Sequence, residues 1–265
     1  MTLRYLRMKL KKIGILWLII PLFNGCGQNI QPDDYASNYV PNNEAAQINF
    51  QLGREYMQRG RNDIALNKLQ KALTLDKNHA YAHHDIAFLY DRLGVNQKAR
   101  HHYQTAVALR PQDSDIQNNY GQFLCKQGQW TEAEKHFLKA LENPVYSTPE
   151  NPYTNAGLCA LQHNKPTEAE TYFRHALQKK PNFPVALYQM AQLNFKQRHY
   201  QIAYDYLQRY EKVAKPTPKS LLLSVHLARA LSNREAEINY ALSLRRNFPD
   251  AVETQQLNQS QRQRP

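Results

Sequence analysis

The chain has 265 residues and a formal net charge of +12, which is enough length for one sizeable domain or for a repeat array. Its basic residues are scattered rather than gathered into a stripe, so the charge does not favour nucleic-acid binding. Three cysteines, Cys26, Cys125 and Cys159, are too few for a disulfide scaffold and too far apart in the sequence for a structural zinc site.

Residues 1–25 have the pattern of an export signal. Basic residues from Arg4 to Lys12 precede an apolar run from Ile13 to Phe23. The apolar run is about ten residues long, too short to cross a hydrocarbon core of about 30 Å as a helix. The sequence therefore predicts a signal peptide rather than a transmembrane anchor.

The signal ends in Leu22-Phe23-Asn24-Gly25-Cys26, which resembles a bacterial lipobox. The resemblance implies that Cys26 is lipidated, and several acyl chains would hold the protein on a membrane. The alternative is a plain secretory signal with a chance cysteine. Gly27, where Asp would retain a lipoprotein in the inner membrane, implies the periplasmic face of the outer membrane. Residues 26–45 are polar and lack a helical period, which predicts a flexible tether.

An internal repeat of 34 residues follows the tether. Small residues recur in two registers that move together, with one interval of 36. The first register is Gly53, Ala87, Gly121, Gly157 and Ala191, and the second is Ala65, Ala99, Ala133, Ala169 and Ala203. A large apolar or aromatic residue follows the second register at Leu69, Tyr103, Phe137, Phe173 and Leu207.

Two antiparallel helices that cross closely need a small residue at each contact, and this explains both registers. Gly60, Gly94 and Gly128 mark turns, and Pro111 and Pro181 end helices. This is the tetratricopeptide (TPR) pattern, which predicts an all-α, right-handed superhelix of about six helix–turn–helix repeats. The TPR domain spans 46–249, as 46–79, 80–113, 114–147, 150–183, 184–217 and a degenerate capping repeat 218–249. Residues 250–265 are Gln-rich without an apolar period, and a disordered tail is expected.

In TPR proteins the first helices line a concave surface, and this resemblance places a partner groove here. The predicted groove residues are Phe50, Arg54, Met57, Tyr81, His84, Phe88, Asn118, Gln122 and Tyr188. Aromatic and soft apolar groups carry much of the energy of protein interfaces. A continuous apolar patch of Phe50, Met57, Tyr81 and Phe88 is expected, off the core register. Additional packing between helices is the alternative interpretation.

No motif for chemistry is found. His79 and His83 have a helical metal spacing, but no glutamate completes a zinc-protease pattern, so the neighbouring histidines are expected to be exposed helix residues. The sequence contains no nucleophile elbow and no phosphate-binding glycine loop. We therefore expect a protein that is not an enzyme and that needs no cofactor, metal or small-molecule substrate.

Cys125 and Cys159 fall near the ends of first helices in successive repeats. Helices 8–10 Å apart are within reach of a cysteine bridge, and an oxidising compartment favours one. A disulfide is predicted, and two buried free thiols are the alternative.

These features together resemble the PilF/PilW family of type IV pilus biogenesis lipoproteins. The stretch from Asn118 to Cys125 followed by Gly128, and the stretch from Pro152 to Cys159, carry the resemblance most closely. It implies an outer-membrane pilotin that binds the pilus secretin and promotes its localisation or multimerisation. The runner-up is another periplasmic TPR lipoprotein, an adaptor for outer-membrane protein assembly or for cell-wall enzymes. A TPR cofactor attached to a hydrolase is a further class.

Overall fold

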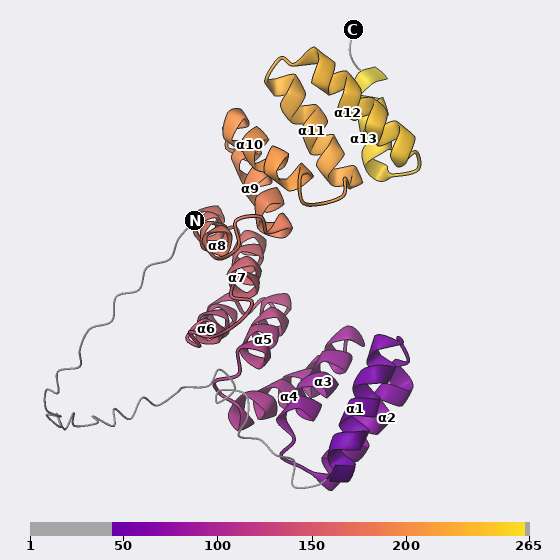
Figure 1. Cartoon of the computed structure of the whole chain (residues 1–265), viewed down its shortest axis with the longest axis vertical. Coiled ribbons are helices and arrows are strands. Elements are labelled where there is room, and N and C mark those ends of the chain that lie inside the picture. Colours follow the sequence, from indigo (N-terminus) through magenta and orange to yellow (C-terminus); the bar gives the residue numbers. More distant parts are fainter. Residues whose placement is uncertain (1–43, 263–265) are drawn as a thin grey trace, which may run out of the picture. The chain divides into compact units, whose positions relative to one another are not determined.

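The structure, a computed structural model, describes residues 44–262, where the regular secondary structure consists of α-helices joined by turns and short loops (Figure 1). Its helices are α1 (Glu44–Gln58), α2 (Asn62–Leu75), α3 (Ala80–Arg92), α4 (Asn96–Leu109), α5 (Ser114–Lys126), α6 (Trp130–Ala140), α7 (Glu150–Gln162), α8 (Pro166–Lys179), α9 (Pro184–Lys196), α10 (Tyr200–Glu211), α11 (Pro218–Ala230), α12 (Arg234–Asn247) and α13 (Val252–Arg262). The expected signal peptide, Cys26 and the tether up to residue 43 lie outside the described residues.

The first twelve of these helices form six helix–turn–helix pairs, and each pair packs against the next. The all-helical TPR arrangement predicted from the sequence is therefore confirmed. First helices start at Ala80, Ser114, Glu150, Pro184 and Pro218, the residues that open the predicted repeats. The first pair differs slightly, because α1 already begins at Glu44 and includes two residues assigned to the tether.

The two registers of small residues lie where the helices of a pair touch. A Cβ placed on Gly53 would lie 2.6 Å from Leu69, and one on Gly157 would lie 2.6 Å from the Phe173 ring. All five alanines of the second register are fully buried. One hydrophobic cluster runs without a break from Phe50 in α1 to Leu227 in α11. Small residues thus set how closely the helices approach, and large ones fill the space between pairs.

The turn inside each pair needs a residue with positive φ. Glycine supplies it in the first three pairs, with φ of 72°, 71° and 76° at Gly60, Gly94 and Gly128. Asn164, Arg198 and Ser232 take the same conformation in the last three, at φ of 56°, 63° and 58°. The geometry of the turn is therefore kept where glycine, and with it the sequence signal, is lost.

The expected disordered tail is wrong for residues 252–262, which form the helix α13. Leu257 in α13 is fully buried, in a cluster with Leu221 and Val225 of α11 and with Ala241 and Leu244 of α12. A single buried leucine leaves almost no apolar period, so a polar capping helix is hard to distinguish from a tail. No helix between residues 44 and 262 is long and apolar enough to cross a membrane.

Candidate partner-binding surfaces

The first helices of the first three pairs enclose a groove, which we call the N-terminal groove. Its volume is about 260 Å³. It is lined by Arg54, Met57 and Gln58 of α1, His84, Asp85 and Phe88 of α3, and Asn119 of α5. Four of the predicted groove residues, Arg54, Met57, His84 and Phe88, are therefore brought together. Phe88 is 36% exposed and stands beside the guanidinium of Arg92.

A charged cluster forms one side of the N-terminal groove. His84 Nδ1 donates to Asp85 Oδ1 at 2.8 Å, and Arg54 Nε lies 3.8 Å from the other carboxylate oxygen. Asn119 Nδ2 donates to His84 Nε2 at 2.8 Å. Since Nε2 accepts, Nδ1 carries the ring proton in this arrangement. The Asp85 side chain is only 13% exposed, whereas that of Arg54 is 60% exposed and available to a partner.

Amide side chains continue this network along the first helices. Asn119 Oδ1 accepts from Gln122 Nε2 at 3.2 Å, and Asn118 Oδ1 accepts from Asn155 Nδ2 of α7 at 2.9 Å. Asn118 is only 6% exposed. The sequence placed Asn118 on the groove surface, whereas the structure buries it as a link between the third and fourth pairs.

Phe50 does not join an exposed apolar patch. It is 6% exposed and belongs to the main hydrophobic cluster. Its ring centroid lies 4.5 Å from that of His79 and 6.3 Å from that of Tyr81. The predicted continuous patch is therefore wrong at Phe50, which packs against the start of the next pair instead of facing the groove.

Tyr81 is held by polar contacts rather than presented to a partner. Its hydroxyl donates to Asp113 Oδ2 at 2.9 Å, and the Arg110 guanidinium lies 5.0 Å from its ring centroid. Burial, followed by the charge of Asp113, raises the pKa of Tyr81 to about 12. Its phenol therefore stays protonated and fixes the joint between the second and third pairs.

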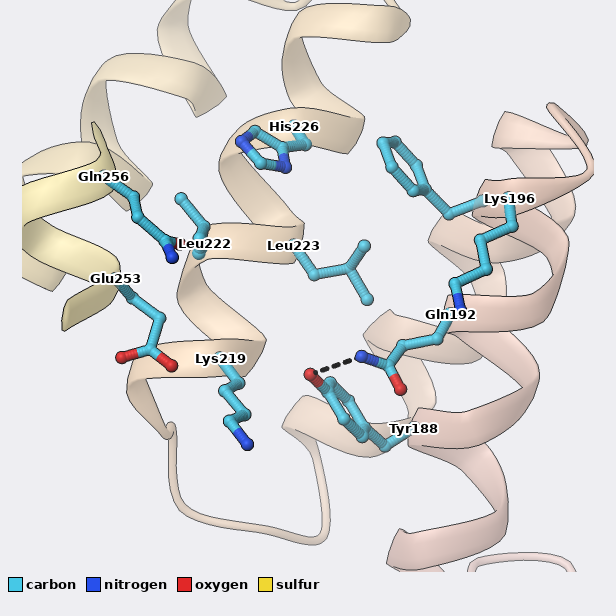
Figure 2. Close-up of a pocket in the computed structure, with 10 residues that line it drawn as sticks. Tyr188, Gln192, Lys196, Lys219, Leu222, Leu223, His226, Glu253 and Gln256 are labelled. Carbon is cyan, nitrogen blue, oxygen red and sulfur yellow. Dashed lines mark hydrogen bonds between the residues drawn. The ribbon is translucent and has the colours of Figure 1, made fainter. Parts of the chain in front are cut away.

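A second groove, the C-terminal groove, has a volume of about 270 Å³ and involves α9, α11 and α13. Figure 2 shows Tyr188, Gln192 and Lys196 on α9 facing Lys219, Leu223 and His226 on α11, with Glu253 and Gln256 contributed by α13. Gln192 Nε2 donates to the Tyr188 hydroxyl at 3.0 Å. Tyr188 thus lines a groove, but one far along the chain from the other predicted residues. Sequence reasoning missed it because α13 was assigned to a tail.

Cys125 and Cys159 form a disulfide between α5 and α7, with their Cα atoms 5.8 Å apart. It closes a loop of 34 residues and stabilises the fold by about 3–4 kcal/mol on the chain-entropy account. The predicted disulfide is therefore present in the structure, and the alternative of two free thiols is not.

The histidines expected to be exposed are in part buried. His79 is 1% exposed, where its Nδ1 accepts from the backbone N–H of Ala82 and so caps α3. His83 is 9% exposed, and its Nδ1 lies 2.9 Å from Nδ1 of His102 on α4. The prediction failed because it considered only spacing within one helix, whereas burial depends on the helix opposite.

Family models described as "Tetratricopeptide repeat" and "TPR repeat" match residues 113–182 and 53–94. The chain is 33% identical over 213 residues to the type IV pilus assembly protein PilF of Pseudomonas aeruginosa, covering 80% of this chain and 84% of that protein. An uncharacterized protein of Haemophilus influenzae is 34% identical over 121 residues, which is 46% of this chain and 68% of that protein.

Solved structures agree with the sequence matches. The structure from a functional characterisation of Pseudomonas aeruginosa PilF superposes with a TM-score of 0.74 at 32% identity, over 82% of this chain and 98% of that one. That of PilW, described as a widely conserved type IV pilus biogenesis factor, gives the same TM-score and identity over 81% and 99%. A TPR protein from Parabacteroides merdae, at 19% identity and a TM-score of 0.59, shares the fold.

Proposed function

Because the chain belongs to the PilF/PilW family of type IV pilus assembly proteins, we propose that it acts as a pilotin. In this proposal it is a lipoprotein on the periplasmic face of the outer membrane that binds the pilus secretin. It promotes the localisation or multimerisation of the secretin and thereby pilus assembly. The observation that carries the proposal is 33% identity to PilF over 84% of that protein.

The N-terminal groove is the surface we assign to the partner. Met57 and Phe88 offer apolar contact, and the exposed guanidinium of Arg54 and the carboxylate of Asp85 flank them. An exposed aromatic ring surrounded by polar groups is the usual form of an interface anchor. The hydrogen bonds from Asp85 through His84 to Asn119 hold the groove wall rigid, so a bound segment meets a preformed surface. We infer that binding, and no catalysis, is the activity of this domain.

The double change Met57→Ala with Phe88→Ala tests the groove. Truncating aromatic anchors costs about 2 kcal/mol or more, roughly thirtyfold in affinity. Secretin multimers in outer-membrane fractions should therefore fall, and less secretin should co-purify with the protein. Phe88 is 36% exposed, so Phe88→Ala alone should change the melting temperature little, whereas Met57 packs partly against the main hydrophobic cluster and its truncation should lower the melting temperature somewhat. The matched control is Ile202→Ala, which removes a 50% exposed apolar side chain from α10.

Full secretin multimers with the double variant would place the binding surface elsewhere. Phe50→Ala is not suitable for this test, since Phe50 is buried against His79 and its loss would destabilise the fold.

Cys26→Ser tests the membrane anchor. With lipidation lost, the folded domain should move from the outer-membrane fraction to the soluble periplasmic fraction, because acyl chains supply the membrane affinity in this proposal. Fractionation with metabolic acyl labelling measures this. Unlabelled wild-type protein in the soluble fraction would argue against the anchor.

A further inference from the structure

Three potential metal ligands converge around the disulfide. The ligand atoms of Cys125, Cys159 and His163 all lie within 4.8 Å of one another, and no other such group occurs among the residues that the structure describes. His163 comes four residues after Cys159, so the two side chains lie on the same side of the last turn of α7. His163 Nδ1 lies 4.0 Å from Cys159 Sγ. Cys125 reaches the same point from α5.

Two cysteine sulfurs and one imidazole nitrogen are donor atoms that suit a d¹⁰ cation such as Zn²⁺. Thiolates and an imidazole are the ligands that Zn²⁺ prefers in proteins. We propose that, once the disulfide is reduced, Cys125, Cys159 and His163 bind one Zn²⁺ ion, so that the oxidation state of the cysteines decides whether the site exists. The sequence alone did not suggest this site, because the two cysteines are 34 residues apart, and only the stacking of successive first helices brings them together.

The geometry allows the change without moving the helices. Tetrahedral Zn²⁺ with Zn–S bonds of about 2.3 Å needs its two sulfurs about 3.8 Å apart. A Cα separation of 5.8 Å permits this by rotation of the cysteine side chains. Gln162 Oε1 already lies 3.3 Å from Cys125 Sγ, which offers an oxygen close to the fourth position.

The surroundings suit a cation. Cys125 is the penultimate residue of α5, and His163 is the C-cap of α7, so the carbonyl ends of two helices face this region. Cys159 is 1% exposed and Cys125 8% exposed, whereas His163 is half-buried, so an ion would enter from the His163 side. The Trp130 ring packs near the imidazole, with centroids 6.2 Å apart, and limits its rotation.

The proton and electron balance is simple. A tertiary phosphine reduces the disulfide by giving two electrons to the sulfurs, takes the oxygen of one water molecule, and leaves two thiols. Zn²⁺ then displaces the two thiol protons to solvent. His163 Nδ1 now donates to the Cys159 carbonyl at 3.0 Å, so the ring must shift its proton to Nε2 when Nδ1 binds the ion.

Titration of the phosphine-reduced protein with Co²⁺, the spectroscopic substitute for Zn²⁺, tests the site. We expect tetrahedral d–d absorption and thiolate-to-cobalt charge transfer at about one ion per chain, and bleaching when Zn²⁺ is added. Calorimetry in buffers of different ionisation enthalpy should show two protons released for each Zn²⁺. His163→Gln removes a ligand and should weaken Zn²⁺ binding by more than about tenfold. About tenfold is the smallest loss usually seen when a residue that only hydrogen-bonds to a metal ligand is changed. The control His199→Gln, in an exposed histidine on another pair, should have no effect.

Any of these titration results overturns the proposal: no charge-transfer band in the reduced protein, equal binding by the oxidised protein, or unchanged affinity in His163→Gln. Far-UV circular dichroism accompanies every titration. If the reduced chain loses helical signal, Zn²⁺ should restore it in the wild type and not in Cys125→Ser. Failure to restore it in the wild type also counts against the site.

Discussion

At the scale of single residues, Gly157 leaves no room for a side chain beside the ring of Phe173. A methyl group on Gly157 would lie 2.6–2.9 Å from three atoms of the ring, and Phe173 is fully buried. Gly157→Ala gains up to about 1 kcal/mol of helix propensity, but overpacking a core costs about 1–3 kcal/mol. We expect a net loss of about 1 kcal/mol in the free energy of unfolding, measured by urea denaturation.

A second variant shows whether the ring is the cause. In the fifth pair Ala191 and Leu207 occupy the same two positions, so Gly157→Ala combined with Phe173→Leu should recover part of the lost stability. An alanine variant as stable as the wild type would mean that the ring shifts at no cost.

The registers of small residues show what the sequence could and could not predict about single residues. Small residues at fixed intervals predicted the helix pairs correctly, because the close approach leaves no other choice of residue. Phe50 and Asn118 were assigned to the groove from their positions in a repeat, yet both are 6% exposed. Whether a first-helix side chain is covered depends on the length of the residues in the next pair, and His79 and Asn155 cover these two.

At the scale of elements, α3 and α4 meet through a pair of histidines, of which His83 is buried and His102 is half-buried. His83 and His102 place their Nδ1 atoms 2.9 Å apart, and His83 Nε2 lies 3.1 Å from the Lys77 carbonyl. A carbonyl only accepts, so His83 Nε2 carries a proton, and in the neutral pair Nδ1 of His83 accepts a hydrogen bond from Nδ1 of His102. Burial, and then the nearby His83 and His101, lower the pKa of His102 from 6.5 to about 4. Burial also lowers the pKa of His83, partly opposed by its hydrogen bond to the Lys77 carbonyl.

Stability should therefore depend on pH through this pair. Since the unfolded chain binds these protons more readily, the contribution is complete above pH 6.5 and is lost as the pH falls from 6.5 towards 4. His102→Gln keeps a donor toward His83 but does not titrate, so its unfolding free energy should fall less between about pH 7 and pH 5. Denaturation at both pH values checks this, and an equal fall in the free energy of unfolding for variant and wild type would contradict it.

At the scale of the whole molecule, the array of pairs has an end that needs covering. Each TPR pair buries one face against the next, so the last pair exposes apolar surface unless something caps it. In the sixth pair Val225 and Glu237 stand where the registers of small residues would continue. Glu237 is 5% exposed and forms ion pairs with Arg229 and Arg234. The regular pattern thus stops at this pair, and α13 supplies the cover.

Leu257 is the residue through which α13 should act. It is fully buried against α11 and α12, so Leu257→Ala removes its apolar contacts and leaves a cavity, which costs about 2–5 kcal/mol. Because stability in a repeat array propagates between neighbours, the sixth pair should loosen first. Hydrogen exchange should therefore rise in α11–α13 before it rises in α1–α4. Val252→Ala, at a 61% exposed position of the same helix, is the matched control and should leave exchange unchanged. The same helix forms one wall of the C-terminal groove, so loosening it should also open that groove. Uniform exchange across all pairs in the Leu257 variant would show instead that the array unfolds as one unit and that α13 does not protect its end separately.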